Sequence, residues 1–479
     1  MKQNIHIIIF VILSFISADA FEGYSLFTAV GGENETSTII MDNEFNQIHS
    51  WIHENRPASM PYLLQDSSIV YPYRVENPTM VAGGVGGGIR KINWNGEVEW
   101  EYIFADEQYQ QHHDIEPLEN GNILILAWER KSAEEAYEMG RIEINNTLGE
   151  MWSVAVLELN PLNGEIVWEW HLWDHLIQDT DPSLPNYGNI SEHPELFDIN
   201  CGVVGTNAGG PQQPNADWIH MNSIHYNPLL DQIVMSSRLQ NELYIIDHST
   251  TSSEAASHSG GISGKGGDIL YRWGNPQNYG RGDASDQLLS SQHSVNWIPQ
   301  GYPGEGNLIL FNNFHSSGIS AVFEISTPLN EDGIYEISDN GSFGPETWTW
   351  IYECDITVPM QGGSFRLENG NTLITQTHIG RIIEVNQMGD IIWDYVHQTD
   401  EIDTFWIARS QKYALDYLET NLLGDINEDG IINVLDAVSL VNIILANGPY
   451  MTQADINLDG SNNVLDVVLM VNVIINGLP

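Results

Sequence analysis

The chain is poor in positive charge. Its 479 residues include 16 Lys and Arg against 65 Asp and Glu, which gives a formal net charge of -49 at pH 7. Such a surface repels nucleic acids and anionic membranes, so we exclude both as partners. The acidity itself is typical of a protein that stays soluble in a salty medium.

Cysteine is nearly absent, with Cys201 and Cys354 as the two representatives. Two thiolates are too few for a metal site built from cysteine alone. In an oxidising compartment the two can pair, but the sequence does not show whether their distance allows a disulfide. The pairing stays open at this stage.

Long apolar runs are missing except at the N-terminus. Residues 1–20 begin with a lysine, continue through an apolar run and end in A-D-A, which is typical of a secretory signal peptide. The run is too short to span a bilayer comfortably, and no other segment qualifies. We therefore expect no membrane span and an exported protein that is secreted, periplasmic or held at the cell surface.

Glycine and tryptophan are plentiful, with 43 and 15 residues. Six segments repeat one pattern, in which a strand, an Asn/Gly turn and a second strand rich in Ile, Val and Trp follow one another. The copies are residues 38–52, 89–102, 154–170, 243–247 with 268–273, 321–325 with 348–352, and 381–395. A further hairpin joins each copy to the next, so each unit has four antiparallel strands.

A repeated four-stranded sheet is the signature of a β-propeller. The sequence therefore predicts an all-β protein with a six-bladed β-propeller at residues 21–412, in which tryptophans fill the space between blades. A β-sandwich is the rival, but it does not need six matched units. The Pro-, Ser- and Gly-rich segments 172–217 and 249–267 are expected to form loops over one mouth.

Histidines gather at the strands that precede the repeated hairpins, in the motifs H-H-D-I, W-I-H-M-N-S-I-H and Q-H-S-V. The first strand of each propeller blade lines the central channel, so the polar ends of these strands are expected to converge near the axis. The candidate residues are His112, His113, His220, Asn222, His225, Arg238, His293 and His378.

Three interpretations of these histidines remain open. Each can be structural and satisfy buried backbone groups. The cluster can instead bind a transition metal. Finally, imidazoles beside an arginine can handle an anionic group in transfer chemistry. Arg238 disfavours a cation and favours a sulfate, phosphate or carboxylate.

The C-terminal region has a different character, with the loops D-I-N-E-D-G and D-I-N-L-D-G each followed by an amphipathic helix. Alternating oxygen ligands and a glycine bend are typical of an EF-hand-like calcium loop. The expected ligands are Asp425, Asn427, Asp429, the Ile431 carbonyl and Asp436, then Asp455, Asn457, Asp459, the Ser461 carbonyl and Asp466.

This pair of loops resembles a type I dockerin module at residues 424–479, preceded by a linker at residues 413–423. The resemblance implies structural calcium, folding that depends on calcium, and a cohesin-type protein partner.

The histidine motifs W-I-H-M-N-S-I-H-Y-N-P, H-H-D-I-E-P-L-E-N-G-N-I-L-I-L and Q-H-S-V-N-W resemble those of bacterial arylsulfate sulfotransferases, over roughly residues 38–400. Members of that family are exported six-bladed propellers. The resemblance implies transfer of a sulfuryl group from a phenolic sulfate ester to a phenol acceptor, without a nucleotide sulfate donor or any catalytic cofactor. Three features depart from the family pattern: the separate N-terminal β-domain of some members is not expected here, a dockerin-like tail is added, and the close disulfide beside the active site of some members has no equivalent pair.

The resemblance also implies roles for single residues. His293 matches the nucleophilic histidine that becomes transiently sulfurylated. The catalytic anion-binding set corresponds to His113, His220 and Arg238, and Asn222 corresponds to a supporting amide. His112, His225 and His378 are weaker candidates for the lining of the same pocket.

Two other functions stay in competition. One is a non-catalytic propeller that binds a ligand or carbohydrate and is recruited to an extracellular assembly by its dockerin. The other is a metal-dependent hydrolase, whose activity a transition-metal chelator would abolish.

Overall fold

The computed structural model describes residues 19–32, 35–205, 214–315, 318–399, 402, 404–418, 424–427, 432–446, 448, 450–457 and 461–476. Most of the expected signal peptide lies outside these residues, as do the expected calcium ligands Asp429, Ile431 and Asp459. The chain divides into two compact units, Met1–Tyr62 with Ile69–Lys412, and Leu63–Ser68 with Tyr413–Pro479.

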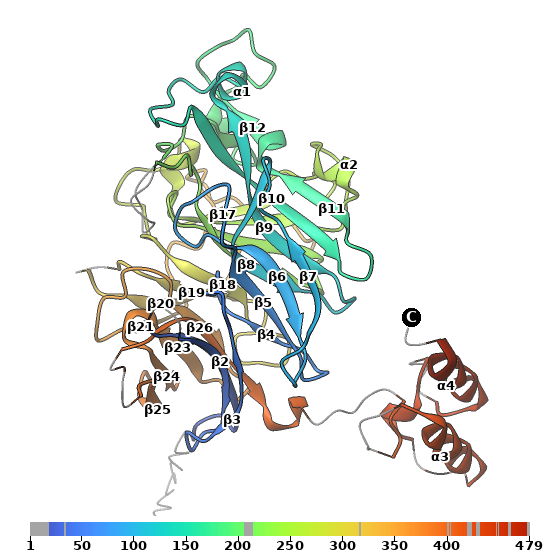
Figure 1. Cartoon of the computed structure of the whole chain (residues 1–479). Coiled ribbons are helices and arrows are strands. Elements are labelled where there is room, and N and C mark those ends of the chain that lie inside the picture. Colours follow the sequence, from blue (N-terminus) through green and yellow to red (C-terminus); the bar gives the residue numbers. More distant parts are fainter. Residues whose placement is uncertain are drawn as a thin grey trace, which may run out of the picture. The chain divides into compact units, whose positions relative to one another are not determined.

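The larger unit is a β-propeller of six four-stranded sheets, which confirms the predicted fold class (Figure 1). The first three blades consist of β26 (Trp406–Ala414), β1 (Gly23–Val30), β2 (Thr36–Met41) and β3 (Gln47–Ile52); β4 (Tyr62–Leu63), β5 (Ile69–Arg74), β6 (Gly87–Ile92) and β7 (Val98–Ile103); and β8 (Tyr109–Pro117), β9 (Ile123–Ser132), β10 (Glu150–Asn160) and β11 (Glu165–His171).

The remaining three blades follow the same order of strands. They consist of β14 (Met221–Asn227), β15 (Gln232–Ser237), β16 (Glu242–Asp247) and β17 (Tyr271–Trp273); β18 (His293–Trp297), β19 (Leu308–Asn312), β20 (Ala321–Ile325) and β21 (Trp350–Glu353); and β22 (Gly363–Arg366), β23 (Thr372–Gln376), β24 (Arg381–Val385) and β25 (Ile391–Val396).

The last strand of the propeller completes the first blade. β26 pairs with β1 although almost the whole chain separates them, and it takes the place that the first strand has in the other blades. This pairing closes the ring and leaves no gap between the first and sixth blades. The repeat had not indicated a strand at this position.

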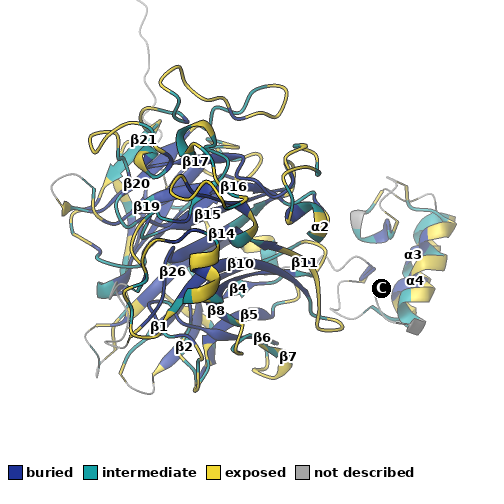
Figure 2. Cartoon of the chain, turned by 90° about the horizontal axis from the view of Figure 1, so that it is seen from above, coloured by how far each residue is buried: buried dark blue, intermediate teal, exposed yellow. Residues whose placement is uncertain are grey.

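The first strands face one another around the axis, because β14 packs against both β8 and β18, and β18 packs against β22. The middle strands β15, β16 and β20 are buried along their whole length (Figure 2). A strand covered on both faces needs apolar or hydrogen-bonded side chains at every position, which explains runs such as I-V-M and L-Y-I-I.

The aromatic residues that end the repeated hairpins link neighbouring blades. On the outer strand of each blade, one indole N–H or phenol O–H donates to a backbone carbonyl of the next blade. The acceptor lies in the turn or loop that precedes the outer strand of that next blade. The pairs are Trp51 with Asn93 (2.8 Å), Tyr102 with Pro161 (2.9 Å), Trp170 with Gly267 (2.7 Å), Trp273 with Pro345 (2.8 Å), Trp350 with Gln387 (2.9 Å) and Trp393 with Asn43 (3.0 Å).

Insertions within and between the blades carry short elements. Within the third blade, α1 (Ala133–Glu138) begins with a capping box at Ser132, and within the fourth blade, α2 (Ser252–Ala255) begins with one at Thr251. Between these two blades, the segment after β11 forms the 3-10 helix η1 (Leu172–His175) and the parallel pair β12 (Leu176–Ile177) and β13 (Phe197–Asp198).

The smaller unit contains the helices α3 (Val434–Leu445) and α4 (Val464–Asn476). They enclose a small apolar core of Ile426, Ala437, Leu440, Ala454 and Met470. The 3-10 helix η6 (Leu415–Leu418) lies in the expected linker. Among the described residues, none of the helices has the length and apolar character that a membrane crossing requires.

Candidate active site

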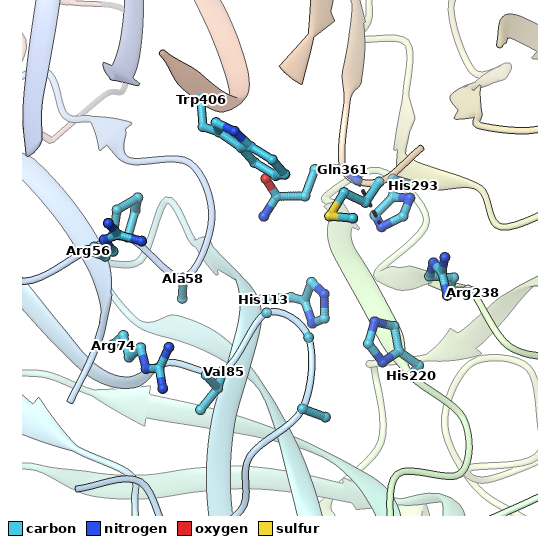
Figure 3. A pocket seen from close by; sticks show the side chains of 15 residues that line it. Arg56, Ala58, Arg74, Val85, His113, His220, Arg238, His293, Gln361 and Trp406 are labelled. Carbon is cyan, nitrogen blue, oxygen red and sulfur yellow. Dashed lines mark hydrogen bonds between the residues drawn. The ribbon is translucent and has the colours of Figure 1, made fainter. Parts of the chain in front are cut away.

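Three histidines and three arginines line one pocket of the propeller, with a volume of about 270 Å³. Figure 3 shows His113, His220 and His293 around one space with Arg238 beside them, and Arg56 and Arg74 on the other side. Trp406 and Gln361 lie at a further edge of the pocket. The structure therefore brings together the four residues expected to perform catalysis, His113, His220, Arg238 and His293.

The backbone at these positions is unusual. His113, His220, Ser294 and Gln361 have φ values of 51°, 53°, 58° and 53°, a left-handed conformation that non-glycine residues rarely adopt. His113 and Ser294 lie where the register of β8 and β18 is irregular, His220 directly precedes β14, and Gln361 lies two residues before β22. Strain of this kind gathers at functional sites, where it aims a side chain out of the strand.

His293 has its ring proton fixed by the surrounding amides. The Asn313 amide nitrogen donates to the Val358 and Gln361 carbonyls, each at 2.8 Å, so its oxygen is the atom that faces His293 Nδ1 at 2.7 Å. Nδ1 must therefore carry the proton. His293 Nε2 is then a free base, and it accepts the backbone N–H of Gln361 at 3.3 Å.

Burial keeps this imidazole neutral. His293 is 4% exposed, and burial lowers its pKa to about 3, further assisted by the nearby charges of Arg238 and His220. An unprotonated Nε2 is thus available throughout the neutral pH range.

His220 is held by a buried carboxylate. Its Nδ1 contacts Asp217 Oδ2 very closely, and its backbone N–H donates to Asp217 Oδ1 at 3.2 Å. Burial disfavours the charge on Asp217, but His220 and the Trp128 indole lower the pKa of this carboxyl below its usual value. An ionised Asp217 favours a proton on His220 Nδ1 and stabilises the doubly protonated ring.

His113 lies edge-on to His220, with ring centroids 4.8 Å apart. Burial, together with the charges of His220 and His112, lowers the His113 pKa well below its usual value. Gly84 packs directly on this ring, because a Cβ on Gly84 would come within 2.2 Å of it. Any larger residue at Gly84 would displace His113 from the pocket.

The pocket is cationic in an acidic protein. Arg56, Arg74 and Arg238 line it, whereas no Asp or Glu does so among the described residues. Within the described part of the chain, none of these three guanidinium groups forms an ion pair with a carboxylate. Unpaired arginines in an acid-free pocket attract an anion with a forked oxygen geometry.

The other predicted site residues do not line this pocket. His112 stacks on Trp128 at a centroid distance of 4.2 Å. The Asn222 side-chain amide donates to the Gln292 carbonyl at 2.7 Å. His225 Nε2 lies 3.7 Å from Glu116, and His378 belongs to the 3-10 helix η5 (Thr377–Ile379).

Several pocket residues were not predicted. Asp217 and Asn313, which contact two of the pocket imidazoles, stand outside the histidine motifs, and nothing in the sequence shows which imidazole they contact. Arg56, Arg74 and Trp406 come from the first two blades and from β26, outside every histidine motif. Three of the 16 basic residues of the chain lie here, but no sequence pattern connects them.

A second pocket of about 420 Å³ adjoins the first. The two share Arg56, Pro57, Gln361 and Trp406, and the second continues toward Val30, Gly31 and Ala408. Trp406 is 41% exposed, so its indole face is open to a planar ligand. The combined cavity offers an anion-binding end and a more apolar end.

The two C-terminal loops fit calcium. Asp425 and Asp455 are 1% exposed, and Asp436 and Asp466 are fully buried. Asp436 accepts the backbone N–H groups of Ile426 (2.9 Å) and Asn433 (2.8 Å). Buried carboxylates at the first and last positions of a loop require a cation, and an oxygen set of this kind suits calcium. Asn427, Asn457 and Ser461 are the other described candidates for its ligands.

Both cysteines are free thiols, so Cys201 and Cys354 do not form the disulfide that the sequence left open. Burial raises the pKa of both thiols to about 12, so neither is a reactive thiolate at neutral pH.

Comparisons with known proteins give two family matches. The sequence model of the arylsulfotransferase (ASST) family matches residues 33–328, which include His113, His220, Arg238 and His293. The type I dockerin domain model matches residues 423–475. A comparison with curated proteins finds no match.

Similar solved structures are distant. A protein of unknown function from Bacteroides caccae is 12% identical over 81% of this chain and 98% of its own, with a TM-score of 0.40. A streptogramin B lyase is 12% identical over 82% of this chain and 94% of its own, with a TM-score of 0.34. A luciferin-regenerating enzyme is 8% identical over 84% and 94%, with a TM-score of 0.35. These likenesses are too low to bear on function.

Proposed function

The chain belongs to the arylsulfotransferase (ASST) family, and on this premise we propose that it transfers a sulfuryl group from a phenolic sulfate ester to a phenol through a sulfo-histidine intermediate. The observation that carries the proposal is the fixed ring proton of His293. Its Nε2 is an unprotonated nucleophile inside an arginine-lined pocket to which no Asp or Glu of the described residues contributes.

In the first half-reaction, His293 Nε2 attacks the sulfur of the donor while the sulfur–oxygen bond to the aryl group breaks. Doubly protonated His220 gives a proton to the departing phenolate, and Asp217 stabilises the remaining ring. Arg238 balances the charge on the sulfuryl oxygens as they move. The Nδ1 proton of His293 stays on the ring and remains hydrogen-bonded to the Asn313 amide oxygen.

In the second half-reaction, the acceptor phenol enters after the first phenol has left. His220 takes the proton of the acceptor, the phenol oxygen attacks the sulfur, and the bond to His293 Nε2 breaks. His293 returns to its starting tautomer, and His220 is again doubly protonated. Neutral His113 contributes a hydrogen bond rather than a charge, since burial keeps its pKa low.

The adjoining cavity provides the space for the aryl groups of donor and acceptor. Trp406 offers an open indole face beside the arginine-lined end, and the apolar walls near Val30 and Ala408 exclude water from a bound ring. Donor and acceptor phenols would occupy this space in turn, which leads to ping-pong kinetics.

The proposal is tested with p-nitrophenyl sulfate as donor and a second phenol as acceptor. We expect nitrophenol release that depends on the acceptor and is lost in His293→Ala. The matched control is His193→Ala, which removes a half-exposed imidazole bonded to Glu195. Release that persists in His293→Ala contradicts the proposal, and no release with a wide set of sulfate esters favours a binding propeller. Inhibition by a transition-metal chelator would favour a hydrolase.

For the C-terminal unit we propose calcium-dependent docking to a cohesin-type protein. Val434, Leu435, Val464 and Leu465 stand at the starts of α3 and α4 and are 64%, 61%, 66% and 56% exposed. Exposed apolar pairs of this kind mark a protein interface. Binding to a panel of cohesins, measured with calcium and with a chelator, tests this. Binding that ignores calcium contradicts it.

We further propose export with cleavage after Ala20. Phe21 N–H donates to Oε1 of buried Glu384 at 2.6 Å, and Asn43 donates to the Phe21 carbonyl at 2.9 Å, so Phe21 is held in the propeller on both sides of its peptide unit. A new ammonium group at Phe21 would meet the Glu384 carboxylate. Mass spectrometry of the exported protein should find an N-terminus at Phe21, and an intact leader would contradict this.

A further inference from the structure

A second group of imidazoles lies outside the pocket, where the insertion at residues 249–267 meets the third blade. His175 is the last residue of η1, His258 lies in the insertion, and Asp268 directly follows it. One ligand atom from each residue lies within 4.8 Å of the other two. Figures 1 and 2 show α2, the helix of this insertion, beside β11.

Hydrogen bonds set the orientation of His175. Its Nε2 lies 2.8 Å from the Ala255 carbonyl, which can only accept, so Nε2 carries the proton. In the neutral ring, Nδ1 then presents a lone pair to Asp268 Oδ1 at 2.8 Å. Two acceptors at this distance need a cation between them, which is either a second proton on the imidazole or a metal ion.

The same carboxylate oxygen meets a second imidazole, because His258 Nδ1 lies 2.7 Å from Asp268 Oδ1. His175 is fully buried and Asp268 is 6% exposed. A buried imidazole whose second nitrogen donates to a backbone carbonyl is the arrangement that orients a metal-ligating histidine.

The surrounding backbone is built closely around the group. A Cβ on Gly267 would lie 1.9 Å from the Ala255 carbonyl and 2.6 Å from His175 Nε2, so only glycine fits beside Asp268. Gly267 N–H donates to the Ser257 carbonyl at 3.0 Å, which places His258 next to Asp268. The Trp170 indole lies parallel to the His175 ring at 5.8 Å and donates to the Gly267 carbonyl.

We propose that His175, His258 and Asp268 bind a divalent transition-metal cation of the zinc class. Two imidazole nitrogens and one carboxylate oxygen are a ligand set that zinc accepts, with bonds of about 2.0–2.2 Å. The contacts would open by roughly half an ångström to admit the ion. The His258 side chain is 63% exposed, so it is free to move and leaves the fourth position to water.

The bound ion would fasten the insertion to the third blade. The insertion is otherwise attached through buried Ala255 of α2 and through polar contacts such as that from Trp168 to Thr250 at 3.1 Å. A metal that ligates His175 on one side and His258 on the other would join the insertion to η1, the segment that follows the third blade. The role is structural and independent of the sulfuryl transfer chemistry.

The test uses the full chain, treated with a chelator and then saturated with calcium so that the C-terminal loops are filled. Zinc binding is measured by competition with a chromophoric chelator, and cobalt binding by its visible absorption. Wild-type protein should bind one more zinc equivalent than His258→Ala, or bind that equivalent about 10-fold or more tightly. His193→Ala is the matched control and should behave as wild type.

Since other imidazoles can also bind metal, the difference between wild type and His258→Ala is the readout. Asp268→Asn should show the same loss if it folds, and zinc should protect residues 249–267 from proteolysis in wild type alone. Equal zinc stoichiometry and affinity in wild type and His258→Ala would overturn the proposal. No zinc binding by either protein would also overturn it, and would identify the group as a protonated imidazole paired with a carboxylate.

Discussion

A single amide sets the chemistry of the pocket at the residue scale. Asn313 uses both of its N–H bonds on backbone carbonyls, which leaves its oxygen to select the proton position on His293. The Ser291 carbonyl also lies 3.0 Å from His293 Nδ1, so without Asn313 the proton keeps only this longer contact and moves more readily to Nε2, where it would block the nucleophile. The same logic places Asp217 behind His220.

Replacement of Asn313 should therefore lower the rate more than it lowers affinity. We expect Asn313→Ala to reduce kcat by about 10²-fold or more with a small change in KM, because the wrong tautomer of a catalytic histidine is strongly inactivating. Steady-state kinetics with p-nitrophenyl sulfate measure this. Asn340→Ala, in an exposed turn, is the control, and equal kcat values in the two variants would contradict the assigned role.

Buried neutral histidines make the fold sensitive to acid. Burial lowers the pKa values of His112 and His293 from 6.5 to about 3. At a pH between these two values, the unfolded chain therefore binds more protons than the folded protein does. The stability they contribute is complete above about pH 6.5 and is lost as the pH falls toward about 3. Each group contributes roughly 1.4 kcal/mol per pH unit in that window.

The measurement is the urea unfolding free energy of wild type and His112→Phe between about pH 7 and about pH 4.5. The variant should lose stability less steeply with acid, because one titrating imidazole is gone. Identical slopes in the two proteins would show that His112 does not titrate on unfolding.

The sequence indicated the pocket residues unevenly. His113, His220, Arg238 and His293 stand in motifs at the starts of inner strands or at the end of a neighbouring one, so pattern and resemblance led to them. Their partners were not foreseeable, since Asn313 meets His293 across a strand pair. Arg56 and Trp406 reach the pocket only because the ring closes. Contacts between residues that are far apart in the chain leave no local pattern in the sequence.

Aromatic side chains join the blades at the element scale. One aromatic residue on each outer strand both fills the gap between sheets and donates a hydrogen bond to a backbone carbonyl of the neighbouring blade. This explains why the sequence repeat ends in Trp or Tyr, and why the repeat was a reliable guide to six blades. β26 carries no such aromatic repeat, so the strand that closes the ring was not predicted.

One of these contacts can be removed with little change of shape. Trp273→Phe keeps an aromatic ring but loses the hydrogen bond to Pro345, so we expect a loss of about 1–2 kcal/mol in the free energy of unfolding. Urea denaturation measures this. Trp100→Phe on β7, which does not form one of the six links, should change stability less, and an equal loss in both would contradict the linking role.

Two units with separate sources of stability make up the whole molecule. The propeller is held by large apolar clusters between its blades, whereas the unit with α3 and α4 has a small core and four buried aspartates. A core of that size does not balance buried charge without a cation. The two units should therefore respond differently to calcium.

Calcium removal should unfold the smaller unit alone. With a calcium chelator we expect loss of the helical circular dichroism of α3 and α4, restored by added calcium, while sulfotransferase activity remains. Asp436→Ala should weaken the calcium response, since this buried carboxylate closes the first loop. An unchanged helical signal in the chelator would contradict calcium-dependent folding.

The sulfuryl adduct on His293 tests the central claim most directly. Protein mixed with an aryl sulfate donor in the absence of acceptor, then quenched and digested under alkaline conditions, is analysed by mass spectrometry. We predict one added sulfuryl group, confined to the peptide that contains His293 and discharged by a phenol. An adduct on another residue, or turnover without any adduct on this peptide, would contradict the account.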